Sequence, residues 1–294
     1  MALVNPALRD IDVSEYAVPG RGRGLFDVFH WRFLLTLLVR KETATRYRNS
    51  ALGWIWSYVR PAAQFAIFYV VLGKFLQMDK GIENFALYLF SGIIVINFFS
   101  EGFANGTKTL VDNAHLVRKI YLPRELFPVA AVIVSFVHFL PQMGVLLVVC
   151  LFFGWIPSLL SVAAILLGLL ILLSFTLGLG MLFGSVNVPF RDAQNFVELI
   201  LLFATWVSPV LYSWTMVARV APDWLMYIYL SNPLTSAVQL FHYGFWAPVT
   251  DAALGEFPDG FWVYAAVSLV ISFVVLFIGQ LVFRRLEPKF AQDL

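Results

Sequence analysis

The chain has 294 residues, of which 60% are apolar and 13% charged, and its mean hydropathy is +0.81. A soluble domain is about 45–50% apolar and about 25% charged, so this composition excludes an ordinary soluble protein and indicates an integral membrane protein. The net charge of +2 favours no class of partner, and the single cysteine, Cys150, excludes an internal disulfide framework.

The first segment, 1–24, contains charged residues, Pro and Gly but no apolar core. It therefore predicts a polar cytoplasmic tail and not a signal peptide. The next run, 25–39, is apolar but too short to span a membrane. Apolar side chains recur along it at helical spacing, at Phe26, Phe29, Phe33 and Leu37. This pattern predicts an interfacial helix over 25–45 that lies at the membrane surface.

Six later stretches have the roughly 20 apolar residues that a helix needs to cross the hydrocarbon core. These predicted spans are 54–76, 85–105, 127–153, 158–184, 195–215 and 260–283. The fourth contains small residues that allow close helix packing, within the chain or between two copies: Gly168, Ser174, Gly178, Gly180 and Gly184. The predicted fold class is an all-α integral membrane protein, with six transmembrane helices in one transmembrane domain over 25–294.

Lys and Arg are distributed unequally about these spans. Apart from Arg60, at the start of the first span, sixteen fall on the side of the N-terminus and three on the other: Lys74, Lys80 and Arg219. Because cytoplasmic segments carry the excess of Lys and Arg, both termini are predicted to be cytoplasmic.

The connection before the last span, about 216–259, is the longest in the chain and is rich in apolar residues. Asn232-Pro233 divides its apolar part into two segments that are each too short to span, since Pro disfavours helix at the residue before it. Backbone ends at membrane depth must be hidden in protein or in a water-filled cavity. We therefore predict a re-entrant helix pair with its break at Asn232 and Pro233, and an ordinary surface loop is the alternative.

The cytoplasmic loop of about 106–126 mixes apolar with basic residues, and Pro123 ends any helix within it. A short helix of this composition predicts a docking element for a partner, and a simple positive-inside anchor is the alternative. The residues expected to carry the docking are Leu116, Val117, Arg118, Lys119, Ile120, Tyr121, Pro123 and Arg124.

Sequence signatures of catalysis are missing from the chain. No Gly-x4-Gly-Lys-Ser/Thr, HExxH or cysteine pair occurs, so no catalytic, cofactor-binding or metal site is expected. His138 is the deepest ionisable residue of the predicted spans, and a lone His there is expected to form a hydrogen bond between helices. Energy for uphill transport would therefore come from a partner.

Aromatic residues are abundant, with 29 Phe, 9 Trp and 11 Tyr. Belts at the two membrane interfaces account for many of them. Aromatic faces also suit a path for sugars, and the candidate pore aromatics are Phe65, Tyr69, Phe98, Phe99, Trp206 and Tyr212.

Four motifs carry a resemblance to a known family. "RYRNSALGWIWSYVRP" supplies Arg46, Tyr47, Arg48, Ser50, Leu52, Gly53, Trp56 and Pro61. "NAHLVRKIYLPRELFPV" supplies Asn113, Leu116, Lys119, Pro123 and Pro128. A later segment supplies Phe190, Arg191, Asp192, Ser208, Pro209 and Tyr212, and "NPLT" occupies 232–235. In this order, over about 25–294, the chain resembles ABC-2 type exporter permeases for cell-surface polysaccharides such as O-antigen, capsule, teichoic acid and galactan. It departs from the family pattern at Gln239 and His242, where an acidic residue and an Arg are common.

The resemblance implies a transport subunit without enzymatic activity in the inner or plasma membrane of a bacterium. Two copies would form the pore, and two copies of a separate ATP-binding subunit, which holds ATP and Mg²⁺, would dock at 25–42 and 113–124. The substrate would be a lipid-linked polysaccharide. Arg46, Arg48 and Arg60 would lie near the cytoplasmic pore mouth, where they would either bind the diphosphate of the lipid or simply anchor the chain.

Two other functions stay open. One is an ABC-2 permease for another hydrophobic cargo, such as a drug or a plain lipid. The other is a membrane-embedded glycosyl- or acyltransferase, for which Asp192 and His115 are the available residues, although neither has an evident catalytic partner in the sequence.

Overall fold

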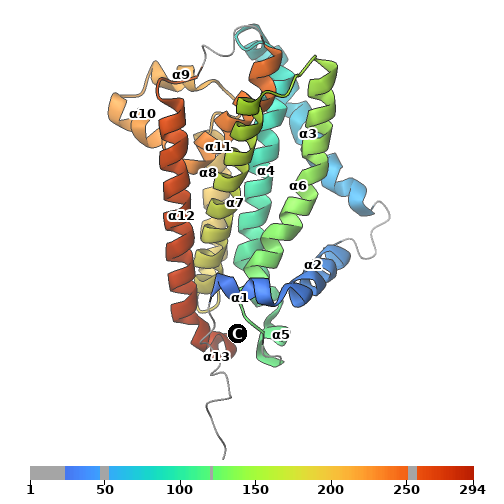
Figure 1. Ribbon diagram of the computed structural model, residues 1–294, viewed down its shortest axis with the longest axis vertical. Coiled ribbons are helices and arrows are strands. Elements are labelled where there is room, and N and C mark those ends of the chain that lie inside the picture. The colour runs from blue at the N-terminus through green and yellow to red at the C-terminus, as the bar shows by residue number, and fades with distance from the viewer. Residues whose placement is uncertain (1–23, 47–52, 120–121, 251–256) are drawn as a thin grey trace, which may run out of the picture.

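The structure is a computed structural model that describes residues 24–46, 53–119, 122–250 and 257–294. These ranges form helices joined by turns, with no strand among them. Four helices are long and apolar enough to cross a membrane: α4 (Phe85–Asp112), α6 (Leu126–Phe152), α7 (Leu159–Asn187) and α12 (Phe261–Leu286). They stand side by side as an upright bundle in which α4 packs against α6 and α7, and α7 packs against α12 (Figure 1).

The first predicted span, 54–76, is a helical run of mixed type. A 3₁₀ turn, η3 (Gly53–Ile55), leads into α3 (Trp56–Phe68), which continues as the π-helix η4 (Tyr69–Phe75). No residue of α3 is buried, because this helix lies at the margin of the bundle and contacts chiefly α4. The run is therefore not among the four long α-helices, although its limits agree with the prediction.

The fifth predicted span, 195–215, is wrong at its outer limit. The helix found there, α8 (Asp192–Val207), ends where Ser208 adopts an extended conformation before Pro209, since Pro clashes with a helical residue that precedes it. Its 16 residues give about 24 Å of helix, less than the roughly 30 Å of a hydrocarbon core. Two of the six predicted spans therefore lack a long uninterrupted α-helix.

The predicted interfacial helix is present as two helices, α1 (Leu25–His30) and α2 (Arg32–Arg46), which cross one end of the bundle (Figure 1). Val28 and Leu38 are buried against the bundle, and Leu38 is 7% exposed. Phe29, Phe33 and Leu37, three members of the predicted apolar face, point outward instead. The segment therefore has two apolar sides, one against protein and one available to lipid.

The long connection before α12 contains three short helices. They are α9 (Trp214–Ala218), α10 (Asp223–Leu230) and α11 (Pro233–Phe241), and α11 continues as the π-helix η6 (His242–Trp246). The predicted break is confirmed, since Asn232 caps α11 by accepting a hydrogen bond of 3.0 Å from the backbone N–H of Leu234. Every residue of α11 is buried, packed against α4, α7 and α12, so the alternative of an ordinary surface loop is excluded for this part.

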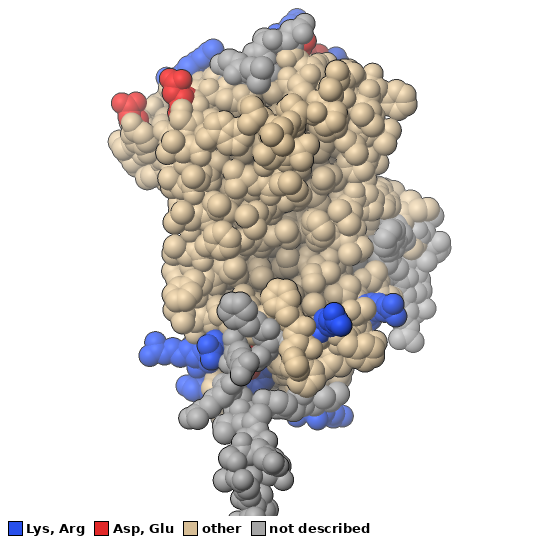
Figure 2. All heavy atoms as spheres, viewed as in Figure 1, with Lys and Arg blue, Asp and Glu red and all other residues tan. Residues whose placement is uncertain are grey.

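Charged side chains gather at the two ends of the molecule. On the face shown in Figure 2 the band between the ends presents none, as expected of a surface in contact with lipid. The short helices α5 (Ala114–Lys119) and α13 (Phe290–Asp293) lie at the same end as α1 and α2 (Figure 1). The first and last described helices therefore share one end of the bundle.

The small residues of α7 serve packing within the chain. A Cβ added to Gly178 would lie 2.6 Å from the backbone N of Leu276 on α12, and one added to Gly184 would lie 2.7 Å from the carbonyl of Gly106 on α4. Only glycine permits helices to approach this closely. This answers the question that the sequence left open for these two positions.

Candidate functional site

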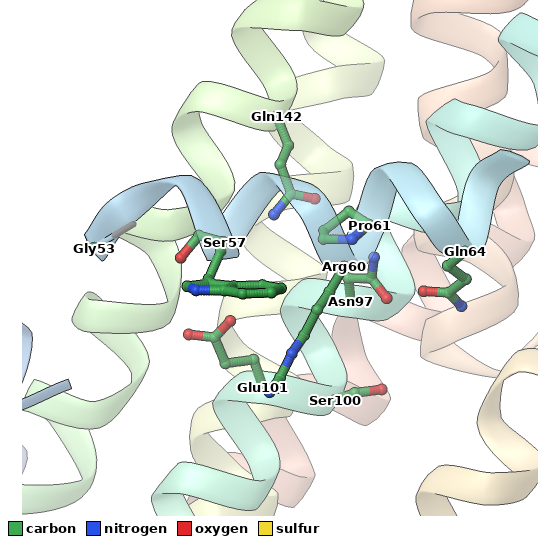
Figure 3. A pocket seen from close by; sticks show the side chains of 10 residues that line it. Gly53, Ser57, Arg60, Pro61, Gln64, Asn97, Ser100, Glu101 and Gln142 are labelled. Atoms are coloured by element: carbon green, nitrogen blue, oxygen red, sulfur yellow. The ribbon is translucent and has the colours of Figure 1, made fainter. Parts of the chain in front are cut away.

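A polar cleft of about 580 Å³ opens between α3, α4 and α6. It is lined by Gly53, Trp56, Ser57, Arg60, Pro61, Gln64, Asn97, Ser100, Glu101 and Gln142 (Figure 3). A group of hydrogen-bonding side chains at this depth of a membrane protein is unfavourable unless it serves a function. We therefore take this cleft as the candidate site.

Helical spacing brings these side chains together. Ser57, Arg60 and Gln64 follow one another at intervals of three and four along α3. On α4, Ser100 and Glu101 lie three and four residues after Asn97. Residues three or four apart share a helix face, so the two polar faces meet across the cleft. Gln64, Asn97, Ser100 and Gln142 were not predicted as site residues, and the polar spacing along each helix is the signal that could have indicated them.

Glu101 is held in place from the neighbouring helix. Its Oε1 lies 2.7 Å from Nδ1 of His138 on α6, and the His138 side chain is only 2% exposed whereas that of Glu101 is 23% exposed. The expectation that His138 forms a hydrogen bond between helices is thereby confirmed. The Arg60 side chain runs across the cleft toward Glu101 (Figure 3).

Of the three arginines predicted to bind a lipid headgroup, the structure places Arg60 in the cleft. Arg48 and the side chain of Arg46 lie outside the described residues. Arg60 is exposed, so its guanidinium is accessible to an anion from the cleft or from the lipid.

The candidate pore aromatics do not form one surface. Phe98 and Phe99 are 3% and 1% exposed, so in this chain they are core residues and present no open face to a pore. Phe65 and Tyr69 are half-buried and stack with ring centroids 5.8 Å apart, and Trp206 is exposed on α8. This placement corrects the sequence-based grouping of the six rings.

Tyr212 lies in the turn that follows α8 and donates a hydrogen bond of 2.5 Å to the carbonyl of Trp206. The same turn is bonded to the N-terminal part of α4, because the hydroxyl of Tyr88 lies 2.9 Å from the carbonyls of both Pro209 and Tyr212. His242 completes this contact by donating from Nε2 to the carbonyl of Tyr88 over 3.0 Å. His242 therefore bonds to backbone here.

The predicted docking element is α5 and the residues after it. Val117 is buried with Leu126 and Phe283, whereas Arg118 and Lys119 are exposed and Leu116 is half-buried. Ile120 and Tyr121 lie outside the described residues. Beyond Pro123, Arg124 donates to the carbonyl of Glu287 and lies 5.9 Å from the ring of Phe290. The loop is thus anchored to the C-terminal helices and presents basic residues outward.

Asn113, between α4 and α5, joins this element to α2. Its Oδ1 accepts from Lys41, and its Nδ2 donates to Oε1 of Glu42 over 3.1 Å and to the carbonyl of Thr109 over 2.9 Å. The side chain is buried, with 2% exposed. The motif that contains Asn113 gives no indication of these contacts within the chain.

Residues 34–246 match the family described as ABC-2 type transporter. The chain belongs to the ABC-2 type transporter family. Three relatives carry the name O-antigen export system permease protein RfbA, two from Klebsiella pneumoniae and one from Myxococcus xanthus. One of the two Klebsiella proteins is 28% identical over 263 residues, which cover 89% of this chain and 95% of that protein. The protein from Myxococcus xanthus is 27% identical over 268 residues, which cover 91% of this chain and 98% of that protein.

The match identifies this chain as a multi-pass membrane permease subunit of an ABC transporter and confirms the resemblance drawn from the four motifs. The polar cleft and α5 both fall within the matched residues, whereas α12 and α13 follow them. The candidate site of this ABC-2 permease therefore lies in the part of the chain that defines the family.

Proposed function

We propose that this ABC-2 permease is one half of the membrane pore of an ATP-driven exporter whose substrate is a lipid-linked polysaccharide of the bacterial cell surface. The observation that carries this proposal is the similarity, over about nine-tenths of the chain, to permeases named for O-antigen export. A second copy of the chain completes the pore, and two ATP-binding subunits on the cytoplasmic side hold ATP and Mg²⁺.

In this proposal the chain crosses the inner or plasma membrane six times, with α3–η4 and α8 as the two crossings that lack a long α-helix. Both termini are cytoplasmic, which is supported by the shared end of α1 and α13 and by the excess of Lys and Arg on that side (Figures 1 and 2). The helices α10 and α11 form a re-entrant pair that enters from the outer face, since their length is too short to span.

The ATP-binding subunit docks on α5 and α2. The exposed Arg118 and Lys119 offer charge to an acidic partner, and Asn113 links the two helices so that both respond to one docking event. ATP binding closes the partner subunits, and hydrolysis with product release shifts the permease between closed and open conformations. Tyr69, Trp206 and Tyr212 are the aromatic side chains left to contact the glycan, since Phe65 faces an apolar cavity.

Reconstitution tests the proposal directly. The permease is purified from its native membrane in detergent and the proteins bound to it are identified, with an ATP-binding subunit expected at equal stoichiometry. The complex is placed in lipid nanodiscs, and ATP hydrolysis is measured with lipid-linked glycan or with small hydrophobic compounds. We expect stimulation by the glycan. Stimulation only by the small compounds would instead identify a permease for another hydrophobic cargo, and transferase activity without a bound ATPase would contradict both.

A further inference from the structure

A second cavity, of about 380 Å³, adjoins the polar cleft between the same three helices. Apart from Tyr58 and Gln142, its lining residues are apolar, and they include Phe65, Phe90, Val145 and Val149. Pro61 and Gln142 line both cavities, so this apolar groove begins where the polar cleft ends. One continuous recess therefore changes from hydrogen-bonding to hydrocarbon walls along its length.

The polar part suits a glycosyl head. Five of its side chains are neutral amides or hydroxyls, Trp56 supplies an aromatic face, and Arg60 supplies one cation. Amides and hydroxyls both donate and accept, as sugar hydroxyls require. Glu101 is held by His138, so its carboxylate is a fixed hydrogen-bond acceptor in the cleft. The guanidinium of Arg60 lies beside it and can bind the anionic group that links sugar to lipid.

Gln142 stands at the boundary and is incompletely satisfied. It is 8% exposed, and its Nε2 donates to the carbonyl of His138 over 3.3 Å. Among the described residues its Oε1 has no hydrogen-bond partner. A buried acceptor without a donor is unfavourable, and a ligand hydroxyl at the junction of the two cavities would remove that cost.

The recess runs along α4 from the middle of that helix to its first turns. Along α4 the apolar lining begins at Ala86 and the polar lining ends at Glu101, toward the end that carries α5. The fifteen helical steps from 86 to 101 correspond to about 22 Å of helix, the length of a long chain and not of a compact solute. A head in the cleft therefore lies near the middle of α4, and its chain points toward the N-terminal end of α4 and the C-terminal end of α6, away from α5.

We infer that the polar cleft and the apolar groove form one binding site for the lipid end of the exported glycan, with the sugar nearest the lipid in the cleft, its anionic linkage on Arg60 and its hydrocarbon chain in the groove. This inference rests on the proposed function, which names the substrate but does not say where its lipid chain binds. The site lies within one protomer, between α3, α4 and α6.

Photolabelling tests the inference on the full-length permease in nanodiscs. The probe is a polyprenyl-diphosphate-linked monosaccharide with a diazirine in its chain, and a phosphatidylethanolamine with the same diazirine serves for comparison. We expect the polyprenyl probe to label peptides of α3 and α6 that include Phe65 and Val145, and an excess of the unlabelled compound to displace it. Equal labelling of these peptides by the phospholipid, without displacement, would show an ordinary lipid contact and overturn the inference.

Three variants sharpen the result. Gln142→Leu and Gln64→Leu each remove hydrogen-bonding groups from the cleft, and each is expected to lower polyprenyl labelling by about tenfold. Gln64 is only half-buried on α3, so its substitution is informative even where Gln142→Leu impairs folding. Val148→Ala changes an exposed residue of α6 outside both cavities and should label as wild type.

Stimulation of ATP hydrolysis by lipid-linked glycan is measured in parallel on the wild-type complex. Stimulation of the wild type together with undiminished labelling of both Gln variants would refute the site and leave the proposed function intact. No stimulation of the wild type would refute the proposed function itself, whatever the labelling.

Discussion

Oε1 of Glu101 on α4 lies 2.7 Å from Nδ1 of His138 on α6, and this contact fixes the acidic wall of the polar cleft. The imidazole is almost fully enclosed, whereas the carboxylate reaches the cleft. The pair therefore joins two of the longest helices at the point where a ligand would bind.

Removal of His138 tests the structural part of this contact. We expect His138→Leu to lower the free energy of unfolding by roughly 1–3 kcal/mol, because it leaves the Glu101 carboxylate without its buried partner. Thermal unfolding of the purified permease in detergent provides the measurement. His115→Leu, on the exposed side of α5, is the matched control and should melt as wild type. Equal melting of the two variants would contradict the expectation.

The approach of α7 to α12 yields a second prediction. A Cβ at Gly178 would meet the backbone of α12, so Gly178→Ala forces the helices apart and should cost about 1–3 kcal/mol of stability. Gly144 on α6 has open space around it, and Gly144→Ala should be neutral or slightly stabilising because alanine favours helix. The same thermal measurement compares them, and a stable Gly178→Ala protein would show that this contact is looser than the structure indicates.

A third prediction concerns the basic face of α5. Reversal of both charges, by Arg118→Glu and Lys119→Glu together, should weaken association with the ATP-binding subunit by about tenfold or more, because like charges then face the acidic partner. Co-purification, or titration of the subunit onto nanodiscs, measures the loss. Lys80→Glu, in the loop that the sequence assigns to the other side, should have no effect. Unchanged association of the α5 variant would argue that the subunit docks elsewhere.

A fourth prediction concerns Asn113. Asn113→Ala removes the bonds to Lys41 and Glu42, so α5 and α2 no longer move as one unit. We expect the variant to bind the ATP-binding subunit and hydrolyse ATP but to export less glycan per ATP consumed. Thr36→Ala, on the exposed side of α2, is the control. A fall of hydrolysis and export in the same proportion would point to a purely structural role for Asn113.

The long helices could be predicted from sequence because their apolar runs exceed the membrane thickness. The spans predicted to end at 153 and 184 end at Phe152 and Asn187. The error at α8 has a local cause, since an apolar run continues through Pro209 although the helix cannot. Hydropathy registers side-chain character but not the backbone constraint that Pro imposes.

The candidate site was less predictable. Polar residues at 97, 100 and 101 share one helix face, and their spacing alone could have indicated a polar stripe within the second span. Which rings of α4 face a cleft and which face the core depends on the helices that surround it. Because α6, α7 and α11 all pack against α4, the burial of Phe98 and Phe99 could be known only from tertiary packing.

The most enclosed of the four long helices, α4, also connects the two ends of the molecule. At one end of α4, Asn113 is hydrogen-bonded to α2, which belongs to the surface proposed to bind the ATP-binding subunit. Near the other end, the hydroxyl of Tyr88 is hydrogen-bonded to the turn that carries Tyr212. The 28 residues of α4 are unbroken by proline, so the helix resists bending and transmits displacement along its axis. If the ATP-binding subunit docks as proposed, a shift imposed at the Asn113 end of α4 would reach the turn that Tyr88 contacts, about 38 Å away, as movement of one rigid helix.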